Sequence, residues 1–337
     1  MNKITHFIVH SKVATAIAAL LCIGVWIYAI IESGNGGVLS YLNLLLYVIF
    51  GMLIGSANER AATGSQRTTL HTTLYYMGCA INPQLAVWQE STICLMLMVA
   101  AYRIMATTYR GRTAMGSYFA AFALVGIASI YSPQLLYLVP VLILCCGFMQ
   151  SLHARTATAA LLGVLVPYWV AFSILYLTDN THLVQSFVER LTAGVSYAPA
   201  ALHVPIGKGD TLAIPMIAIQ WVWALMLAIP AIIRHTLSGT SKVKTRAIQN
   251  MQIGHMGTLF VGMLILPSLY TTMQPVLITL TATIGYGFFV SENKSRGRDI
   301  WLITLFVIWL LILGLNVWNE WSEAAQPPPP PSDRPRQ

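Results

Sequence analysis

The polar residues with the clearest chemical potential lie between positions 179 and 211, in the longest segment that separates two apolar runs. This segment holds His182, Arg190 and His203, and Glu32 directly follows the first apolar run. Arginine presents a planar fork of donors that suits phosphate. These four residues therefore form the candidate catalytic set of a lipid-linked glycan polymerase or ligase, with Arg190 as the diphosphate clamp. The alternative, which we favour, is a solvated cap held by local pairs.

Metal and cofactor chemistry has little support in the sequence. His182 and His203 lack metal-ligand spacing. The five cysteines all fall inside apolar runs and read as small buried hydrophobes. The sequence contains no phosphate-binding glycine loop, no HExxH and no CxxC motif. We expect no cofactor and no metal, and we leave the question of an enzymatic role open, leaning towards a non-catalytic protein.

Composition places the elements around these residues in a membrane. Hydrophobic residues make up 56% of the 337 residues and charged residues only 9%. A soluble domain carries roughly a quarter charged residues, and without them its surface would expose large apolar patches. The net charge of +8 lies in short segments between apolar runs. That placement is typical of a topology signal, so we do not expect nucleic acid as a partner.

The apolar runs predict an all-α, polytopic bundle of about 11 transmembrane spans. Each run approaches the roughly 20 residues that a helix needs to cross the hydrocarbon core. The expected spans are Val13–Ile31, Val38–Ala57, His71–Trp88, Ser91–Thr107, Ala114–Tyr131, Gln134–Ser151, Ala157–Thr178, Leu212–Ile233, His255–Tyr270, Gln274–Val290 and Ile300–Trp318. The third span is the weakest because it contains His71, Asn82 and Pro83.

The basic residues predict a cytoplasmic amino terminus and a periplasmic carboxyl terminus. If all eleven segments cross, every basic residue except Arg190, Lys208, Arg334 and Arg336 falls on the cytoplasmic side or at its boundary. Without the third crossing, the later basic segments would lie on the wrong side. We divide the chain into a transmembrane domain, 1–318, and a disordered, proline-rich periplasmic tail, 319–337.

Other features predict how the bundle is held together. Uncharged polar residues inside the spans are expected to hydrogen-bond neighbouring helices; they are Asn43, Asn82, Gln220, Gln274 and Asn316. Prolines within the spans predict bent helices. The 183–191 stretch, with Leu183, Phe187 and Leu191 on one face, predicts a short amphipathic helix in the outer interface. The segment 234–252 is expected to be a basic connector.

Part of the chain resembles a known family. The similarity lies in Ala101–Ile104, in AAFALVGIASIY at 120–131, in Ser132–Pro133 and Leu135–Leu144, and in LLGVLVPYWVAF at 161–172. Over roughly the middle quarter of the chain, these stretches resemble an uncharacterised family of multi-span inner-membrane proteins from Bacteroidota-type bacteria. The resemblance implies a bacterial cytoplasmic (inner) membrane and carries over no catalytic residue.

These observations lead to two functional hypotheses. The first is a non-catalytic component of envelope assembly, or of the transport of hydrophobic or lipid-linked cargo, because the spans are almost free of charge and contain prolines. The second is the glycan polymerase or ligase, acting at the periplasmic face. The expected partners are membrane lipids, with a lipid-linked glycan and other membrane proteins as further candidates.

Overall fold

The computed structural model of the chain is helical throughout the residues that it describes. These are residues 8–9, 11–32, 37–61, 69–111, 114–196, 221–233, 243–266, 268–289 and 296–324. No strand occurs within these ranges. The predicted all-α class is therefore confirmed.

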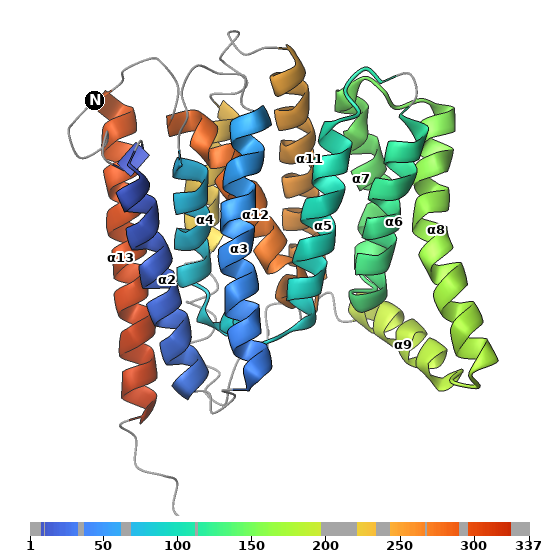
Figure 1. Cartoon of the computed structure of the whole chain (residues 1–337), viewed down its shortest axis with the longest axis horizontal. Coiled ribbons are helices and arrows are strands. Elements are labelled where there is room, and N and C mark those ends of the chain that lie inside the picture. Colours follow the sequence, from blue (N-terminus) through green and yellow to red (C-terminus); the bar gives the residue numbers. More distant parts are fainter. Residues whose placement is uncertain are drawn as a thin grey trace, which may run out of the picture.

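The helices run alternately up and down along one common direction (Figure 1). Their bounds are α2 Lys12–Glu32, α3 Val38–Ala61, α4 Leu70–Ala80, η1 Pro83–Ala86, α5 Glu90–Ala106, α6 Met115–Tyr131, α7 Leu135–Cys145, η2 Cys146–Met149, α8 Ala154–Leu177, α9 His182–Ser196, α11 Val243–Ile265, α12 Ser268–Phe289 and α13 Arg296–Ala324. A further helix covers Trp221–Ile233. Helix α9 departs from the common direction and lies across the far end of α8.

Two of these helices are long and apolar enough to cross a membrane. They are Lys12–Ile31, within α2, and Ala154–Leu177, which is α8. Only 28% of the first and 22% of the second is buried against the rest of the chain, so both direct apolar side chains outwards. Shorter apolar stretches occupy Val38–Ile54, Met115–Tyr131, Leu135–Met149, Trp221–Ile233 and Asp299–Leu315. The count of eleven spans stays a prediction.

Charged residues gather at the two ends of the helices. Basic residues stand in the first turn of helices that start at the upper end in Figure 1: Lys12 in α2, Arg155 in α8, Lys244 in α11 and Arg296 in α13. At the opposite end, Arg190 is the single basic residue among those that the structure describes. The described residues therefore carry the charge asymmetry that the sequence predicts.

Several helix boundaries differ from the prediction. Helix α11 begins at Val243, inside the expected basic connector, because Lys244, Arg246 and neighbouring residues are good helix formers. It ends at Ile265 rather than at residue 270, since the residue before a proline disfavours helix and Pro267 follows. Helix α13 continues to Ala324, past the expected end at residue 318, because no glycine or proline interrupts it there. Residues 325–337 of the expected tail lie outside the described residues.

Helices α6 and α8 make the closest helix contact, and two glycines permit it. A Cβ at position 126 would lie 2.7 Å from the carbonyl oxygen of Val164. A Cβ at position 163 would overlap the carbonyl oxygen of Phe119. Small residues let helix backbones approach in this way in membrane proteins. The pair Gly126 and Gly163 thus fixes α8, which carries α9, against the bundle.

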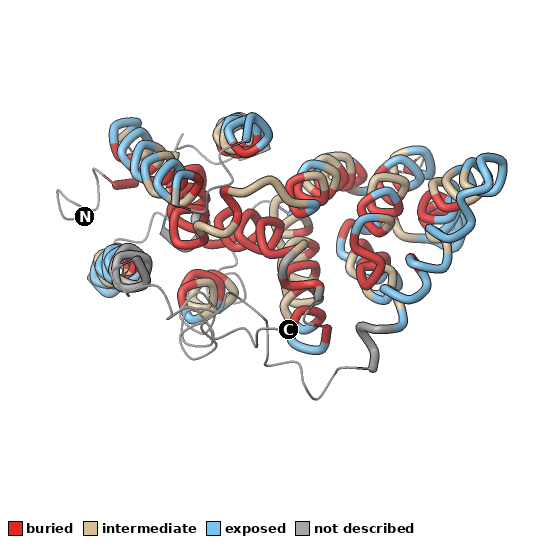
Figure 2. Tube along the Cα trace, turned by 90° about the horizontal axis from the view of Figure 1, so that it is seen from below, coloured by how far each residue is buried: buried red, intermediate tan, exposed pale blue. Residues whose placement is uncertain are grey.

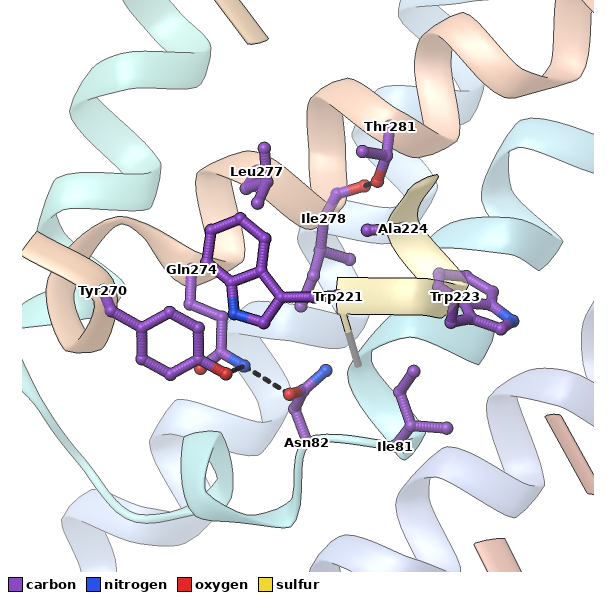
Figure 3. A pocket seen from close by; sticks show the side chains of 10 residues that line it. All are labelled: Ile81, Asn82, Trp221, Trp223, Ala224, Tyr270, Gln274, Leu277, Ile278 and Thr281. Carbon is purple, nitrogen blue, oxygen red and sulfur yellow. Dashed lines mark hydrogen bonds between the residues drawn. The ribbon is translucent and has the colours of Figure 1, made fainter. Parts of the chain in front are cut away.

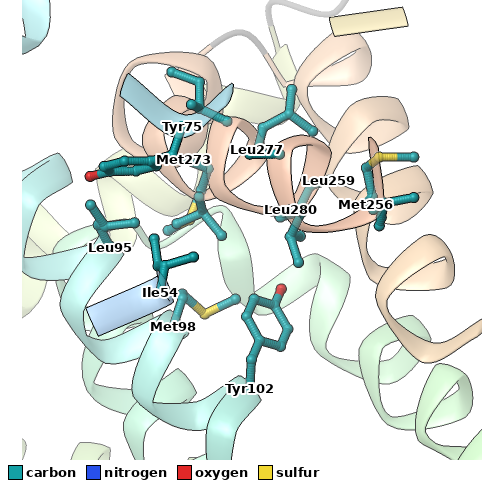
Figure 4. Packing of buried hydrophobic residues seen from close by; sticks show 14 of the residues in the cluster. Ile54, Tyr75, Leu95, Met98, Tyr102, Met256, Leu259, Met273, Leu277 and Leu280 are labelled. Carbon is teal, nitrogen blue, oxygen red and sulfur yellow. The ribbon is translucent and has the colours of Figure 1, made fainter. Parts of the chain in front are cut away.

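The main core lies where α4, α5, α11 and α12 meet. Figure 4 shows Met98 and Tyr102 of α5 packed towards Leu259 of α11 and Leu280 of α12. Buried residues concentrate in this central region, whereas outer helices such as α3 and α8 expose much of their surface (Figure 2). The core therefore surrounds α4, the helix that the sequence marks as weakest.

Candidate functional site

Among the four predicted catalytic residues, the structure describes the side chains of His182 and Arg190. His182 is the first residue of α9 and Arg190 lies in its third turn; both side chains are exposed. Glu32 is the last residue of α2, and its side chain lies outside the described part, as does the whole of His203. Within the described residues, no group of three His, Cys, Asp or Glu side chains could hold a metal.

Arg190 contributes to packing through its backbone. The amide of Gln134, at the start of α7, donates to the carbonyl oxygen of Arg190 at 2.8 Å. The hydroxyl of Tyr137 donates to the next carbonyl, that of Leu191, at 3.2 Å. The predicted helix exists, and Leu191 packs against the core as expected. The expected inward face ends before Leu183. Phe187 is buried, whereas Leu183 is exposed.

A different group of polar residues converges at the interruption of α4. This helix ends at Ala80, and after Ile81 and Asn82 the chain forms the short 3₁₀ turn Pro83–Ala86. Proline lacks a backbone donor and its ring clashes with the preceding turn of an α-helix, so Pro83 ends the helical ladder. At the break the regular ladder gives way to a long bond from Ile81 N–H to the carbonyl of Met77, at 3.4 Å, and a 3₁₀-type bond from Asn82 N–H to that of Cys79, at 3.0 Å.

Side chains from distant helices bind the carbonyls at the end of α4. The indole N–H of Trp309, on α13, donates to the carbonyl oxygen of Met77 at 2.9 Å. The indole N–H of Trp26, on α2, donates to Cys79 at the same distance. Both tryptophans are buried. Each of these carbonyls also accepts a backbone N–H, so each indole adds a second hydrogen bond and at the same time satisfies its own buried donor.

The side chain of Asn43, on α3, donates hydrogen bonds to carbonyls that follow the break. Its side-chain amide lies 2.8 Å from the carbonyl oxygen of Leu85 and 3.1 Å from that of Ala86. The amide oxygen of Asn43 accepts a hydrogen bond from the hydroxyl of Thr92, on α5, at 2.6 Å. Asn43 is fully buried. One asparagine thus joins α3, η1 and α5.

Gln274 of α12 closes the same region from the opposite side (Figure 3). Its amide N–H groups donate to the hydroxyl of Tyr270, at 3.0 Å, and to the side-chain oxygen of Asn82. Its amide oxygen accepts from the side-chain amide of Gln84 at 3.1 Å. We call Asn82, Gln84, Tyr270 and Gln274 the amide cluster. It ties α12 to both sides of the break in the third predicted span.

Aromatic residues line a small cavity beside the amide cluster. Trp221 stacks on Tyr270 with ring centroids 6.0 Å apart, and its edge meets Phe260 at 4.4 Å. Trp221, Tyr270, Trp223 and Ile278 are among the residues that line a cavity of about 30 Å³. This volume is close to that of one water molecule. In the arrangement described, the cavity is too small for a cargo molecule.

The chemistry of this site is that of hydrogen bonding. Its amides, indoles and phenol donate and accept hydrogen bonds, whereas general acid–base catalysis uses groups that exchange a proton near neutral pH. A break in a helix can change its backbone angles without breaking a continuous hydrogen-bond ladder. The amide cluster is therefore suited to hold the end of α4 and the 3₁₀ turn that follows it against α12.

Sequence reasoning had singled out part of this site. The prediction that Asn43, Asn82 and Gln274 hydrogen-bond other segments is confirmed: Asn43 donates to Leu85, and Gln274 of α12 bonds both Asn82 and Gln84. Gln220 lies outside the described residues, as does the side chain of Asn316. The roles of Trp26 and Trp309 were missed, because an apolar helix gives no signal of which indole faces a distant carbonyl.

Comparisons with known proteins add no relative: the chain matches no family model, no curated protein and no solved structure.

Proposed function

We propose that this chain is a multi-pass protein of a bacterial cytoplasmic membrane that passes a hydrophobic or lipid-like cargo, as a non-catalytic component of envelope assembly. The amino terminus is placed in the cytoplasm and the carboxyl terminus in the periplasm.

Charge placement supports the orientation. Loops with an excess of Lys and Arg stay in the cytoplasm. The end of the bundle with Lys12, Arg155 and Lys244 is then cytoplasmic, and the end with α9 is periplasmic. Reporter fusions after Arg246 and after Thr181 test this arrangement. We expect them in opposite compartments, and a shared compartment would refute the topology.

The interruption of α4 is the observation that carries the functional proposal. Non-helical backbone at membrane depth occurs where it is enclosed by protein or lines a cavity, and broken helices form the binding sites of many transporters. Here the break is enclosed by α2, α3, α12 and α13, and its polar partners are uncharged. A site without charge favours an apolar cargo over an ion, because intramembrane ion pathways use ionisable side chains.

The test is lipid passage in vesicles that contain the purified full-length chain. The probe is a phospholipid with a fluorescent acyl chain, and a membrane-impermeant reductant reports the fraction in each leaflet. We expect passage faster than in protein-free vesicles. Gln274→Leu keeps the side-chain volume but removes the bonds to Asn82, Gln84 and Tyr270. We expect it to change the rate by about tenfold, the equivalent of about 1.4 kcal/mol.

A matched control for this variant is Leu310→Ala, which alters an exposed apolar residue of α13. Its rate should equal that of the unchanged chain. If the folded, unchanged chain moves the probe no faster than protein-free vesicles do, the proposed cargo class is wrong.

A further inference from the structure

A second cavity lies at the periplasmic end proposed for the bundle, between α8 and α9. We call it the outer groove. It has a volume of about 810 Å³, within the range of about 300–1,000 Å³ typical of small-molecule sites. Its walls include Trp169, Phe172, Tyr176 and Leu177 of α8, and Val184 and Gln185 of α9. Figure 1 shows α9 running across the end of α8.

The inner wall of the outer groove is built from packed aromatic rings. Phe172 meets Tyr168 and Phe187 with ring centroids 5.7 Å apart in each case. Tyr168 and Phe187 are 5.5 Å apart, edge to face. The hydroxyl of Tyr168 donates to the hydroxyl of Ser129, on α6, at 2.7 Å. The wall is thus anchored to the bundle.

The other wall, α9, is held at its far end by α7. The hydrogen bonds from Gln134 and Tyr137 to the carbonyls of Arg190 and Leu191 fix the second half of the helix. Phe187 fixes its middle. The groove is therefore a built feature between two anchored helices, with its open side along α8.

The open side of the groove continues into a surface that faces lipid in the proposed arrangement. Helix α8 has the length and composition of a membrane span and is mostly unburied. Trp169 and Tyr176 are each 75% exposed and stand in its second half. Tryptophan and tyrosine are enriched at the level of the headgroups. A lipid chain can enter the groove from this surface without crossing water.

The charged residues near the groove favour one class of lipid headgroup. No charged side chain lines it; its polar groups are Ser173, Thr181 and Gln185. Two exposed ionisable residues flank Thr181 along the chain: Asp179 lies two positions before it and His182 one position after it. An anionic headgroup would meet the Asp179 carboxylate without a basic partner in the lining. A zwitterionic headgroup can therefore place its cation near Asp179 and its phosphate near His182.

We propose that the outer groove binds an acyl chain of a zwitterionic phospholipid from the outer leaflet, and that this lipid class is the cargo. The statement that this lipid is transported rests on the proposed function. The binding site itself does not depend on it.

The test uses the full-length chain in lipid nanodiscs that contain phosphatidylcholine with a photoreactive acyl chain. Peptide mass spectrometry then locates the adducts. Ser173→Trp fills the groove with a large ring that competes with the acyl chain for the same space. We expect adducts on Trp169 and Tyr176 to fall by about tenfold, the equivalent of about 1.4 kcal/mol. Ile174→Trp is the matched control, because it adds the same ring at the same depth on an exposed position outside the groove. Its adducts should match those of the unchanged chain.

The outcomes separate the groove from the transport activity. Adducts spread evenly over exposed parts of α2 and α8, or unaffected by Ser173→Trp, overturn the groove as a binding site. Stronger competition by phosphatidylglycerol than by phosphatidylethanolamine overturns the zwitterionic assignment. If Ser173→Trp abolishes the adducts but the passage rate is unchanged, the groove binds lipid that is not cargo. If adducts form at the groove but no variant of the chain moves lipid, the proposed function fails while the binding site stands.

Discussion

Replacing Asn43 with leucine tests whether the interrupted segment depends on side chains from other helices. Leucine has the same number and branching of non-hydrogen side-chain atoms but cannot form hydrogen bonds. The change removes the donors that lie 2.8 Å from the carbonyl of Leu85 and 3.1 Å from that of Ala86. It also removes the acceptor of the Thr92 hydroxyl. All three groups then lose a partner inside the bundle.

The magnitude follows from these three lost bonds. A buried group left unsatisfied costs about 1–3 kcal/mol in soluble proteins, whereas hydrogen bonds between membrane helices average about 0.6 kcal/mol, with maxima near 1.7. Using about 1 kcal/mol for each group, we expect the free energy of unfolding to fall by about 3 kcal/mol. This is a large share of a typical total of about 5–15 kcal/mol.

The assay is reversible unfolding in mixed micelles with increasing fractions of a denaturing detergent, followed by circular dichroism. Leu45→Ala is the control, because Leu45 lies on the same helix with an exposed side chain. It should change the free energy of unfolding by less than about 0.5 kcal/mol. A loss for Asn43→Leu no larger than that of the control would refute the reasoning that these bonds sustain the break.

Two further predictions concern helix packing and the candidate catalytic residue Arg190. Gly163→Ala places a methyl group against the carbonyl of Phe119. Because this overpacking outweighs the better helix propensity of alanine, the free energy of unfolding in detergent should fall by about 1–2 kcal/mol. Gly24→Ala, on an open face of α2, should instead raise stability by up to about 1 kcal/mol, and equal effects at both sites would contradict the close-contact argument. Arg190→Ala should leave lipid passage and folding unchanged, because the main-chain carbonyl of this residue makes its hydrogen bond to α7. If deletion of the gene causes an envelope defect and the Arg190→Ala variant fails to correct it, that result would instead favour the glycan polymerase or ligase.

The helical class and the positions of most helices could be read from the amino-acid order alone. Apolar runs long enough for helices, and charges confined to their ends, are local properties that require no knowledge of neighbours. The same local reading failed at boundaries such as Val243 and Ala324, where helix propensity carries a helix beyond its apolar part. The sequence also pointed to Arg190 and His182 as candidate catalytic residues, because ionisable side chains between apolar runs are conspicuous in any sequence.

The sequence by itself determined that the third predicted span is weak, since Asn82 and Pro83 break its pattern, and that Asn43 and Gln274 need polar partners. That these polar groups find their hydrogen-bond partners around one interruption becomes visible in the folded chain. The partners come from α2, α3, α12 and α13, which are far apart along the chain. Which indole or amide reaches which carbonyl depends on how each helix is rotated and how deep it sits. Those quantities are set by packing the whole bundle at once, and no local pattern of residues encodes them.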